Sequence, residues 1–283
     1  MVEKEKEWNI VIKPKTSWFE INFTELFKYK DLILLFVKRD FVVFYKQTIL
    51  GPLWYIIQPL VNTIVFTIIF GKLAKISTDG IPPFIFYMSG TVVWGYFALC
   101  VTLTSNTFNQ NKDIFGKVYF PRLTVPVAHV IISLLQFAIS FFIFISFLIY
   151  FKVSGSLINI NIYVLFLPLI ILQMAILGLG FGILISALTT KYKDLTFVMS
   201  FFVQLWMYAT PIVYPLSIVP EKYRIISVLN PMTSVVECFR GAFLGVTSIE
   251  LNHILISLIF TIFIFFIGIL LFNRIEKSFM DTV

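Results

Sequence analysis

A polar and aromatic stripe lies within the first long apolar run of the sequence. Trp54, Gln58 and Asn62 recur at intervals of four residues, so they stack on one face of a helix. The run Leu53–Phe70 carries no charge, and about 20 such residues are enough to cross a bilayer core. Because polar groups cost free energy in lipid, this face is expected to meet protein or water. The stripe therefore indicates a wall that faces something other than lipid.

Groups that would carry catalysis or drive transport are missing from the sequence. It holds no G-x-x-x-x-G-K-[ST] loop, and no carboxylate lies in any long apolar run. Cys100 and Cys238 are far apart, and His129 and His253 have no second ligand close by in the sequence, which favours structural roles and no metal site. We expect a chain that is not an enzyme and holds no cofactor. It would be passive or powered by a partner.

The elements that position the stripe follow from composition. Of the 283 residues 59% are hydrophobic and 13% are charged, and the mean hydropathy is +0.92, which indicates a multi-span membrane protein. We predict an all-α integral membrane protein whose transmembrane domain covers residues 53–272. Its six spans are Leu53–Phe70, Phe84–Asn106, Leu123–Phe151, Ile162–Thr189, Leu195–Tyr214 and Ile254–Phe272. Small residues in the fourth span predict close helix packing, and they are Ala175, Gly178, Gly182 and Ser186.

The segment before the first span is polar and then amphipathic. Residues 1–24 have mixed charge and no apolar run, so they predict a tail without a cleavable signal peptide. Residues 25–47 predict a helix with a basic face, suited to the membrane interface. We expect the chain to bend at Gly51-Pro52 and enter the first span.

Basic residues are distributed unevenly between the two sides of the predicted bundle. Sixteen of the 22 Lys and Arg residues fall on the side that holds both termini. The positive-inside rule makes that side cytoplasmic, including the tail at residues 273–283.

Two connections have unusual composition. Residues 109–122 form a cytoplasmic elbow with aromatic residues among charges, which marks a contact site or a segment that packs on its own bundle. Residues 215–250, on the outer side, are too apolar for a solvated loop and too broken by prolines to span. They predict two short re-entrant or interfacial helices between the fifth and sixth spans, Ile225–Leu229 and Thr233–Leu244, with Asn230-Pro231 starting the second.

Five sequence blocks, in order from Tyr45 to Gly245, resemble one transporter family. The blocks are YKQTILGPLWYIIQPL, SGTVVW, KDIFGKVYFPR with Pro126, TPIVYP and LNPMTSVVECFRGAFLG. They are similar to the permease subunits of type-2 ABC exporters, and within these to the exporters of O-antigen, capsule or teichoic-acid chains. The segment KYKD at Lys191–Asp194 departs from relatives that carry Arg there, and Lys cannot form the same bidentate contact.

The resemblance implies partners and a docking site. It implies a homodimer in the bacterial inner membrane, joined to two cytoplasmic ATPase subunits that hold ATP and Mg. It also implies that the elbow resembles a coupling helix seated in a groove of the ATPase. The predicted docking residues are Asp113, Ile114, Phe115, Lys117, Tyr119, Phe120, Lys191 and Asp194.

The resemblance also implies a lipid-linked polysaccharide substrate of the undecaprenyl-diphosphate type. Aromatic faces and amides suit a path for such a glycan. The predicted path residues are Trp54, Tyr55, Gln58, Asn62, Tyr87, Thr91, Trp94, Phe197, Phe201, Gln204 and Tyr208. The alternative is that these aromatic residues belong to the core or to interfacial belts.

Two further sets of residues complete the predicted site. Basic residues near the cytoplasmic interface, Lys38, Arg39, Lys46 and Arg122, could receive the pyrophosphate or attract anionic membrane lipids. An outer gate would comprise Asn230, Pro231, Glu237 and Arg240, in which the last two form either a gate pair or a surface pair of little energetic effect.

The predicted function is the transmembrane subunit of an ATP-driven exporter of lipid-linked polysaccharide, most simply O-antigen. An exporter of teichoic acid, capsule, a drug or another lipid would share the architecture. A membrane glycosyltransferase is a third class, which the lack of a carboxylate cluster disfavours. Nothing in the sequence points to nucleic acid.

Overall fold

The chain folds into helices of very different lengths. The structure, a computed structural model, describes residues 23–47, 49–192, 194–246 and 250–282. The helices are α1 (Phe23–Lys28), α2 (Lys30–Gln47), α3 (Trp54–Phe66) with a π-helical continuation at Thr67–Leu73, α4 (Pro83–Ser105), α5 (Thr107–Gln110), α6 (Lys112–Phe115), α7 (Thr124–Val153), α8 (Leu167–Lys191), α9 (Leu195–Ala209), α10 (Glu221–Leu229), α11 (Pro231–Phe243) and α12 (Leu251–Thr282). Short 3₁₀ turns occur at Gly51–Leu53, Ile162–Phe166 and Leu216–Ile218. The all-α prediction is confirmed for this part of the chain.

Among the residues that the structure describes, five helices are long and apolar enough to cross a membrane. They are α3 with its continuation, α4, α7, α8 with the turn before it, and α12. The predicted span Leu195–Tyr214 is shorter, because α9 ends at Ala209 after 15 residues. Thr210 is extended (φ −96°, ψ 143°) because it precedes Pro211, which disfavours helical backbone. The described chain thus has five full-length candidates and one shorter apolar helix.

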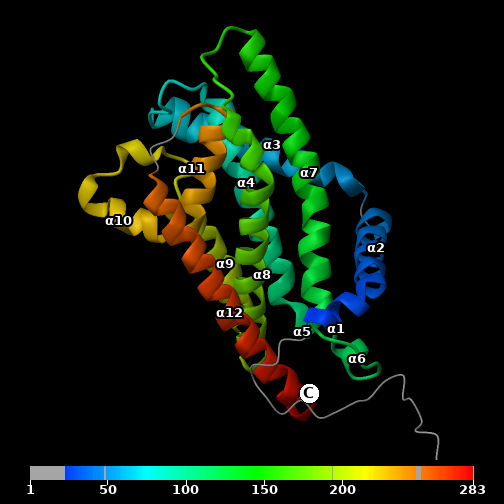
Figure 1. Ribbon diagram of the computed structural model, residues 1–283. Coiled ribbons are helices and arrows are strands. Elements are labelled where there is room, and N and C mark those ends of the chain that lie inside the picture. Colours follow the sequence, from blue (N-terminus) through cyan, green and yellow to red (C-terminus); the bar gives the residue numbers. More distant parts are fainter. Residues whose placement is uncertain (1–22, 48, 193, 247–249, 283) are drawn as a thin grey trace, which may run out of the picture.

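Helix α4 is the centre of the bundle, and α3, α7, α8, α9 and α11 pack around it (Figure 1). Small residues bring α8 close to α4, which confirms the predicted close packing and shows which helix is the partner. A Cβ added to Gly178 would lie 2.7 Å from Cys100 Cβ, and one added to Gly182 would overlap Thr104. Glycine is therefore required for this approach of α8 to α4.

One end of the bundle carries an aromatic cluster from distant parts of the chain. Phe36 of α2, Phe108 of α5, Phe115 of α6, Phe120 and Phe272 of α12 are all buried in it. The rings of Phe36 and Phe120 lie 5.7 Å apart and those of Phe108 and Phe272 lie 4.7 Å apart. We call this the elbow end, because α5 and α6 form the predicted elbow there, beside α1 and the end of α12 (Figure 1).

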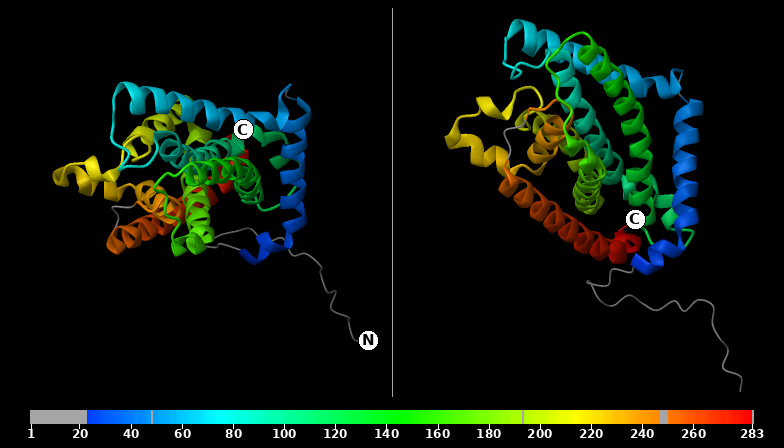
Figure 2. Two further views of the ribbon diagram at one scale, coloured as in Figure 1. Left: turned by 90° about the horizontal axis from the view of Figure 1, so that it is seen from above. Right: turned by 45° about the horizontal axis from the view of Figure 1, so that its top comes forward.

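The amphipathic segment is two helices, not one. At Tyr29 the backbone N–H bonds the carbonyl of Leu26, three residues back, and this tight turn separates α1 from α2. The predicted bend follows α2, since Gly51 has φ +46°, a left-handed conformation that glycine adopts without strain. Figure 2 shows the result, a sharp corner where α2 meets α3, which then runs obliquely across the other long helices.

The final helix is longer than the predicted sixth span. Helix α12 begins at Leu251 and continues to Thr282, so the predicted tail at residues 273–283 is largely the end of this helix. Leu26 of α1 and Ile275 of α12 both pack on the elbow-end cluster, which brings the two ends of the described chain together.

Two short helices precede α12 as predicted, at other bounds, and their re-entrant or interfacial position stays a prediction. Pro231 is the first residue of α11, and the Asn230 side chain accepts from the Met232 N–H at 3.1 Å, as the Asn-Pro pair predicted. Helix α11 is almost entirely buried against α4, α8 and α12, while α10 projects from the bundle (Figure 1).

Candidate functional site

A cavity of about 720 Å³ opens where α2, α3 and α7 meet, and we call it the corner cavity. Aromatic side chains line the α2–α3 corner, where the Phe44 and Tyr55 rings stack with centroids 4.6 Å apart. Its polar lining comprises Arg39, Asp40, Gln58, Gln110, Asn111, His129 and Gln136. The cavity therefore offers amides, a cation and ring faces together.

A histidine and a carboxylate face one another in this cavity. His129 of α7 is 4% exposed, and its Nε2 lies 3.7 Å from an Asp40 carboxylate oxygen. The same carboxylate accepts from Arg39 Nε at 2.7 Å. Within the described chain, His129 Nδ1 is buried without a hydrogen-bond partner. A buried ring nitrogen of this kind is a candidate contact for a polar ligand.

The stripe on α3 leads out of the corner cavity. Trp54 and Gln58 line the cavity and are exposed, Tyr55 is half-buried beside them, and Asn62 is exposed two turns further along α3. The Ser140 hydroxyl of α7 donates to the Tyr55 carbonyl at 3.3 Å, which fixes this part of α3 against the bundle.

The predicted stripe on α9 is likewise open. Phe197 is 82% exposed and Phe201 62%, and Gln204 and Tyr208 are also exposed. An apolar helix face this open in a single chain must be covered by lipid or protein.

The predicted path residues on α4 lie elsewhere than expected. Tyr87, Thr91 and Trp94 are all buried, because α4 is packed on every side. Thr91 Oγ1 lies 3.1 Å from Thr63 Oγ1 of α3, and the Trp94 ring packs 6.1 Å from that of Trp206 of α9. In this structure the three residues join α3 and α9 to α4 and do not line an open surface.

The four basic residues predicted to receive a pyrophosphate are not gathered at one point. Only Arg39 lines the corner cavity, where its guanidinium lies 4.7 Å from the centre of the Phe36 ring. Lys38 and Lys46 are exposed on α2, and the Arg122 guanidinium lies 5.6 Å from the centre of the Phe115 ring.

The predicted docking residues separate into an outer and an inner set. Asp113, Lys117, Tyr119 and Asp194 are exposed and Ile114 is half-buried. Phe115 and Phe120 are 4% and 5% exposed, so the expectation that they are displayed for a partner is wrong. They pack in the elbow-end cluster because this burial removes their apolar rings, and those of their neighbours, from water. The Lys191 side chain lies outside the described part of the chain.

The predicted gate pair is buried, which contradicts the surface alternative. Arg240 is 1% exposed and Glu237 3%, with Arg240 Nη1 3.6 Å from the Glu237 carboxylate. The guanidinium also donates to the carbonyls of Pro211 at 2.5 Å and Ile212 at 2.8 Å. Burial lowers the pKa of Arg240, and the nearby Glu237 carboxylate opposes this shift. A guanidinium stays charged at neutral pH.

Asn230 ties the same segment to α9. Its carbonyl oxygen accepts from Trp206 Nε1 at 3.0 Å and its amide donates to Thr210 Oγ1 at 2.8 Å. Asn230 and Arg240 thus fasten the unwound segment after α9 to α11. The structure thus shows a hydrogen-bonded joint between these helices, and its role as an outer gate stays a prediction.

Sequence reasoning missed several residues of the corner cavity. Asp40 and His129 are far apart in sequence, and no local pattern brings them together. The sequence did contain a clue to Gln136, because a lone amide within an apolar span must contact another polar group or water. Gln173 in α8 is a similar case with a structural outcome, since its amide donates to Ser257 of α12 at 2.6 Å.

Known proteins resemble this chain over most of its length. An O-antigen export system permease protein RfbA of Klebsiella pneumoniae is 29% identical over 256 residues, which are 89% of this chain and 95% of that protein. RfbA of Myxococcus xanthus is 26% identical, covering 77% of this chain and 82% of its own length. The polysialic acid transport protein KpsM of Escherichia coli is 24% identical, with 82% and 89% covered.

The family described as ABC-2 type transporter matches residues 31–244. That range begins in α2 and ends just after α11, so it contains the corner cavity, the elbow and the buried joint. With more than half of its length matched, this chain belongs to the ABC-2 type transporter membrane family.

Proposed function

We propose that this chain is the transmembrane subunit of an ATP-driven exporter of lipid-linked polysaccharide, with O-antigen as the first substrate to test. Family membership supports transport, and the relatives named as O-antigen export permeases support the substrate class. The observation that carries the mechanism is the α3 stripe, which opens into a cavity containing Arg39.

The elbow end is the cytoplasmic side in this proposal, and two ATPase subunits dock there. Asp113, Lys117 and Tyr119 supply an exposed, mixed-charge surface for them. Behind this surface, Phe115 packs against Phe120, and Phe120 packs against Phe36 of α2. Because a packed core transmits displacement, movement of the elbow would move α2, which forms one wall of the corner cavity. ATP hydrolysis could in this way reach the substrate site.

The substrate enters at the corner cavity and leaves along α3 and α9. Arg39 and the amides around it suit the pyrophosphate and first sugars, and the exposed rings of Trp54 and Phe201 offer flat faces for sugars further along. One copy cannot enclose a path, since both stripes are open in the single chain. A homodimer with the two open faces toward each other would close it.

Reconstitution tests the path. The chain and its ATPase partner in proteoliposomes should show ATP hydrolysis stimulated by lipid-linked glycan. Trp54→Ala with Gln58→Ala should lower that stimulation about ten-fold, in line with loss of one stacking ring and one amide contact. The matched control is Phe263→Ala, an exposed ring on α12 outside the stripes, which should leave stimulation unchanged.

Docking is tested separately on exposed residues. Asp113→Asn with Tyr119→Ser should abolish export while the chain still inserts and purifies. Phe115→Ala is unsuitable for this purpose, since Phe115 is a core residue whose loss would destabilise the elbow end. Normal export by the double variant would remove the elbow from the docking proposal. Stimulation by an unrelated lipid or drug, and none by glycan, would reassign the substrate.

A further inference from the structure

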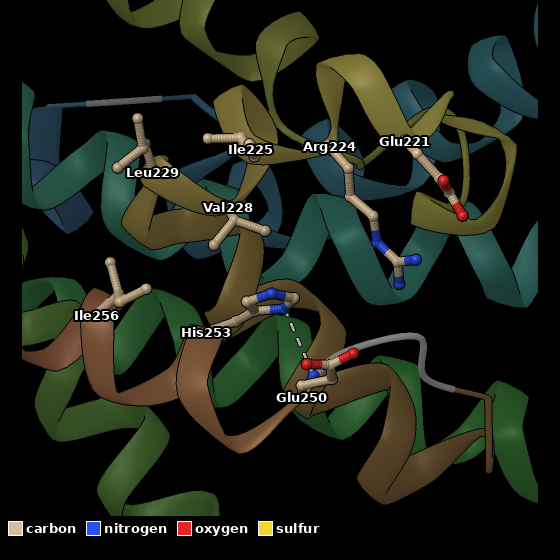
Figure 3. A pocket seen from close by; sticks show the side chains of 8 residues that line it. All are labelled: Glu221, Arg224, Ile225, Val228, Leu229, Glu250, His253 and Ile256. Atoms are coloured by element: carbon tan, nitrogen blue, oxygen red, sulfur yellow. Dashed lines mark hydrogen bonds between the residues drawn. The ribbon is translucent and has the colours of Figure 1, made fainter.

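A second pocket, of about 370 Å³, lies between α10 and α12, away from the elbow end. Figure 3 shows that its lining divides into two halves. Glu221, Arg224, Glu250 and His253 gather on one side, and the apolar side chains Ile225, Val228, Leu229 and Ile256 on the other. Its volume falls in the range of small-ligand sites, roughly 300–1,000 Å³.

The polar half lies at the membrane-surface end of α12. Glu250 and His253 stand at the start of the candidate span Leu251–Ile275, and Ile256 is one turn further into it. Helix α10 has the same order, with Glu221 and Arg224 in its first turns and Leu229 at its end. Both walls therefore change from charged to apolar in the direction of the bilayer core, as an amphiphile does.

The apolar half continues onto an open surface. Leu255 and Ile259 of α12 are 49% and 67% exposed, and Ile226 and Leu229 of α10 are 67% and 56% exposed. An acyl chain lying in the pocket could therefore run on along α12. The exposed apolar face of α10, a helix too short to span, fits the same lipid environment.

The charged half contains both signs. Arg224 reaches into the pocket from α10, and Glu221 and Glu250 stand on either side of the polar half (Figure 3). His253 Nδ1 accepts from the Glu250 backbone N–H at 3.5 Å, so in the neutral ring Nε2 carries the proton and can donate. A phosphate matches Arg224 and His253, and an ammonium group matches the two carboxylates.

We propose that this pocket binds a zwitterionic phospholipid with a primary amine headgroup, of the phosphatidylethanolamine type. The phosphate lies against Arg224 and His253, the ammonium against Glu221 or Glu250, and one acyl chain against Val228, Leu229 and Ile256. The net negative charge of an anionic lipid would be repelled by the two carboxylates, and the larger negative charge of a diphosphate carrier would be repelled more strongly. The site is distinct from the corner cavity and needs only that α12 crosses the membrane.

The test uses the full-length chain in nanodiscs made from equal parts of phosphatidylethanolamine and phosphatidylglycerol. Retained lipid is identified by native mass spectrometry after gentle release into detergent. The wild type should retain the ethanolamine lipid about ten-fold over the glycerol lipid, the scale of two charge-assisted contacts. A phosphatidylethanolamine with a photoreactive acyl chain should label the peptides that carry Leu229 and Ile256.

Variants assign the headgroup contacts. Glu221→Gln with Glu250→Gln should reduce the preference to about two-fold or less, as expected when the ammonium loses both anions. Arg224→Gln should lower retention of both lipids. Lys222→Gln is the matched control, because Lys222 is an exposed cation on the same helix that does not line the pocket.

Three outcomes would overturn the proposal. Equal retention of the two lipids by the wild type would show that the headgroup is not recognised. This measurement uses no variant, so it does not depend on whether the variants fold. Photolabel confined to other helices would place the lipid elsewhere. Displacement of the bound lipid by undecaprenyl phosphate would assign the pocket to the substrate carrier, while leaving the proposed export function intact.

Discussion

Replacing Arg240 by methionine removes the centre of the joint between α9 and α11. The carbonyls of Pro211 and Ile212 would each lose a donor at 2.5 and 2.8 Å, and the Glu237 carboxylate would lose the cation 3.6 Å away. Each buried carbonyl left unbonded costs about 1–3 kcal/mol. Breaking a buried ion pair from one side costs about 3–5 kcal/mol. We therefore expect Arg240→Met to lower the free energy of unfolding by about 3–5 kcal/mol, because these penalties overlap.

Unfolding of the purified chain in mixed micelles, titrated with sodium dodecyl sulfate, would measure this loss. The double variant Arg240→Met with Glu237→Gln should recover about 1–2 kcal/mol, since no anion then remains buried without its cation. Lys222→Met, an exposed cation in the same segment, should change stability by less than about 0.5 kcal/mol. If Arg240→Met unfolds within about 1 kcal/mol of the wild type, the joint does not hold these helices together and the reasoning fails.

Three further substitutions test the packing and the corner cavity. Gly182→Ala should lower the free energy of unfolding by about 1–3 kcal/mol, because the added Cβ would overlap Thr104 of α4. The control Gly95→Ala places its Cβ in open space, so it should leave the free energy of unfolding unchanged or raise it in the same titration. Asn230→Ala should cost about 1–3 kcal/mol, since it removes the cap of α11 and the bond to Trp206, and wild-type stability would show that these bonds are dispensable. His129→Leu should leave stability nearly unchanged but lower glycan-stimulated ATP hydrolysis; full stimulation would exclude the ring from the substrate site.

Local patterns in the sequence predicted most of the fold. Apolar runs set the long helices, the small residues of the fourth span predicted close packing without naming the partner helix, and Asn230-Pro231 predicted the start of α11. The errors came where tertiary packing decided the outcome. Phe115 and Phe120 look like displayed aromatics in an elbow, yet they are needed to cover the elbow end. The sequence left Arg240 open between a gate pair and a surface pair, and only the fold shows that it is a buried donor to the unwound carbonyls after α9.

The corner cavity shows the same limit on the functional side. Helical periodicity placed Trp54 and Gln58 on one face, and that face does line the cavity. Periodicity cannot say which helix stands opposite, so it assigned Trp94 to the path although α9 covers it. Periodicity also could not pair Asp40 with His129, because that contact forms only when α2 packs alongside α7. A polar stripe on one helix therefore predicts a polar surface. The charged residues of that surface lie on other helices, and only the fold shows which helices these are.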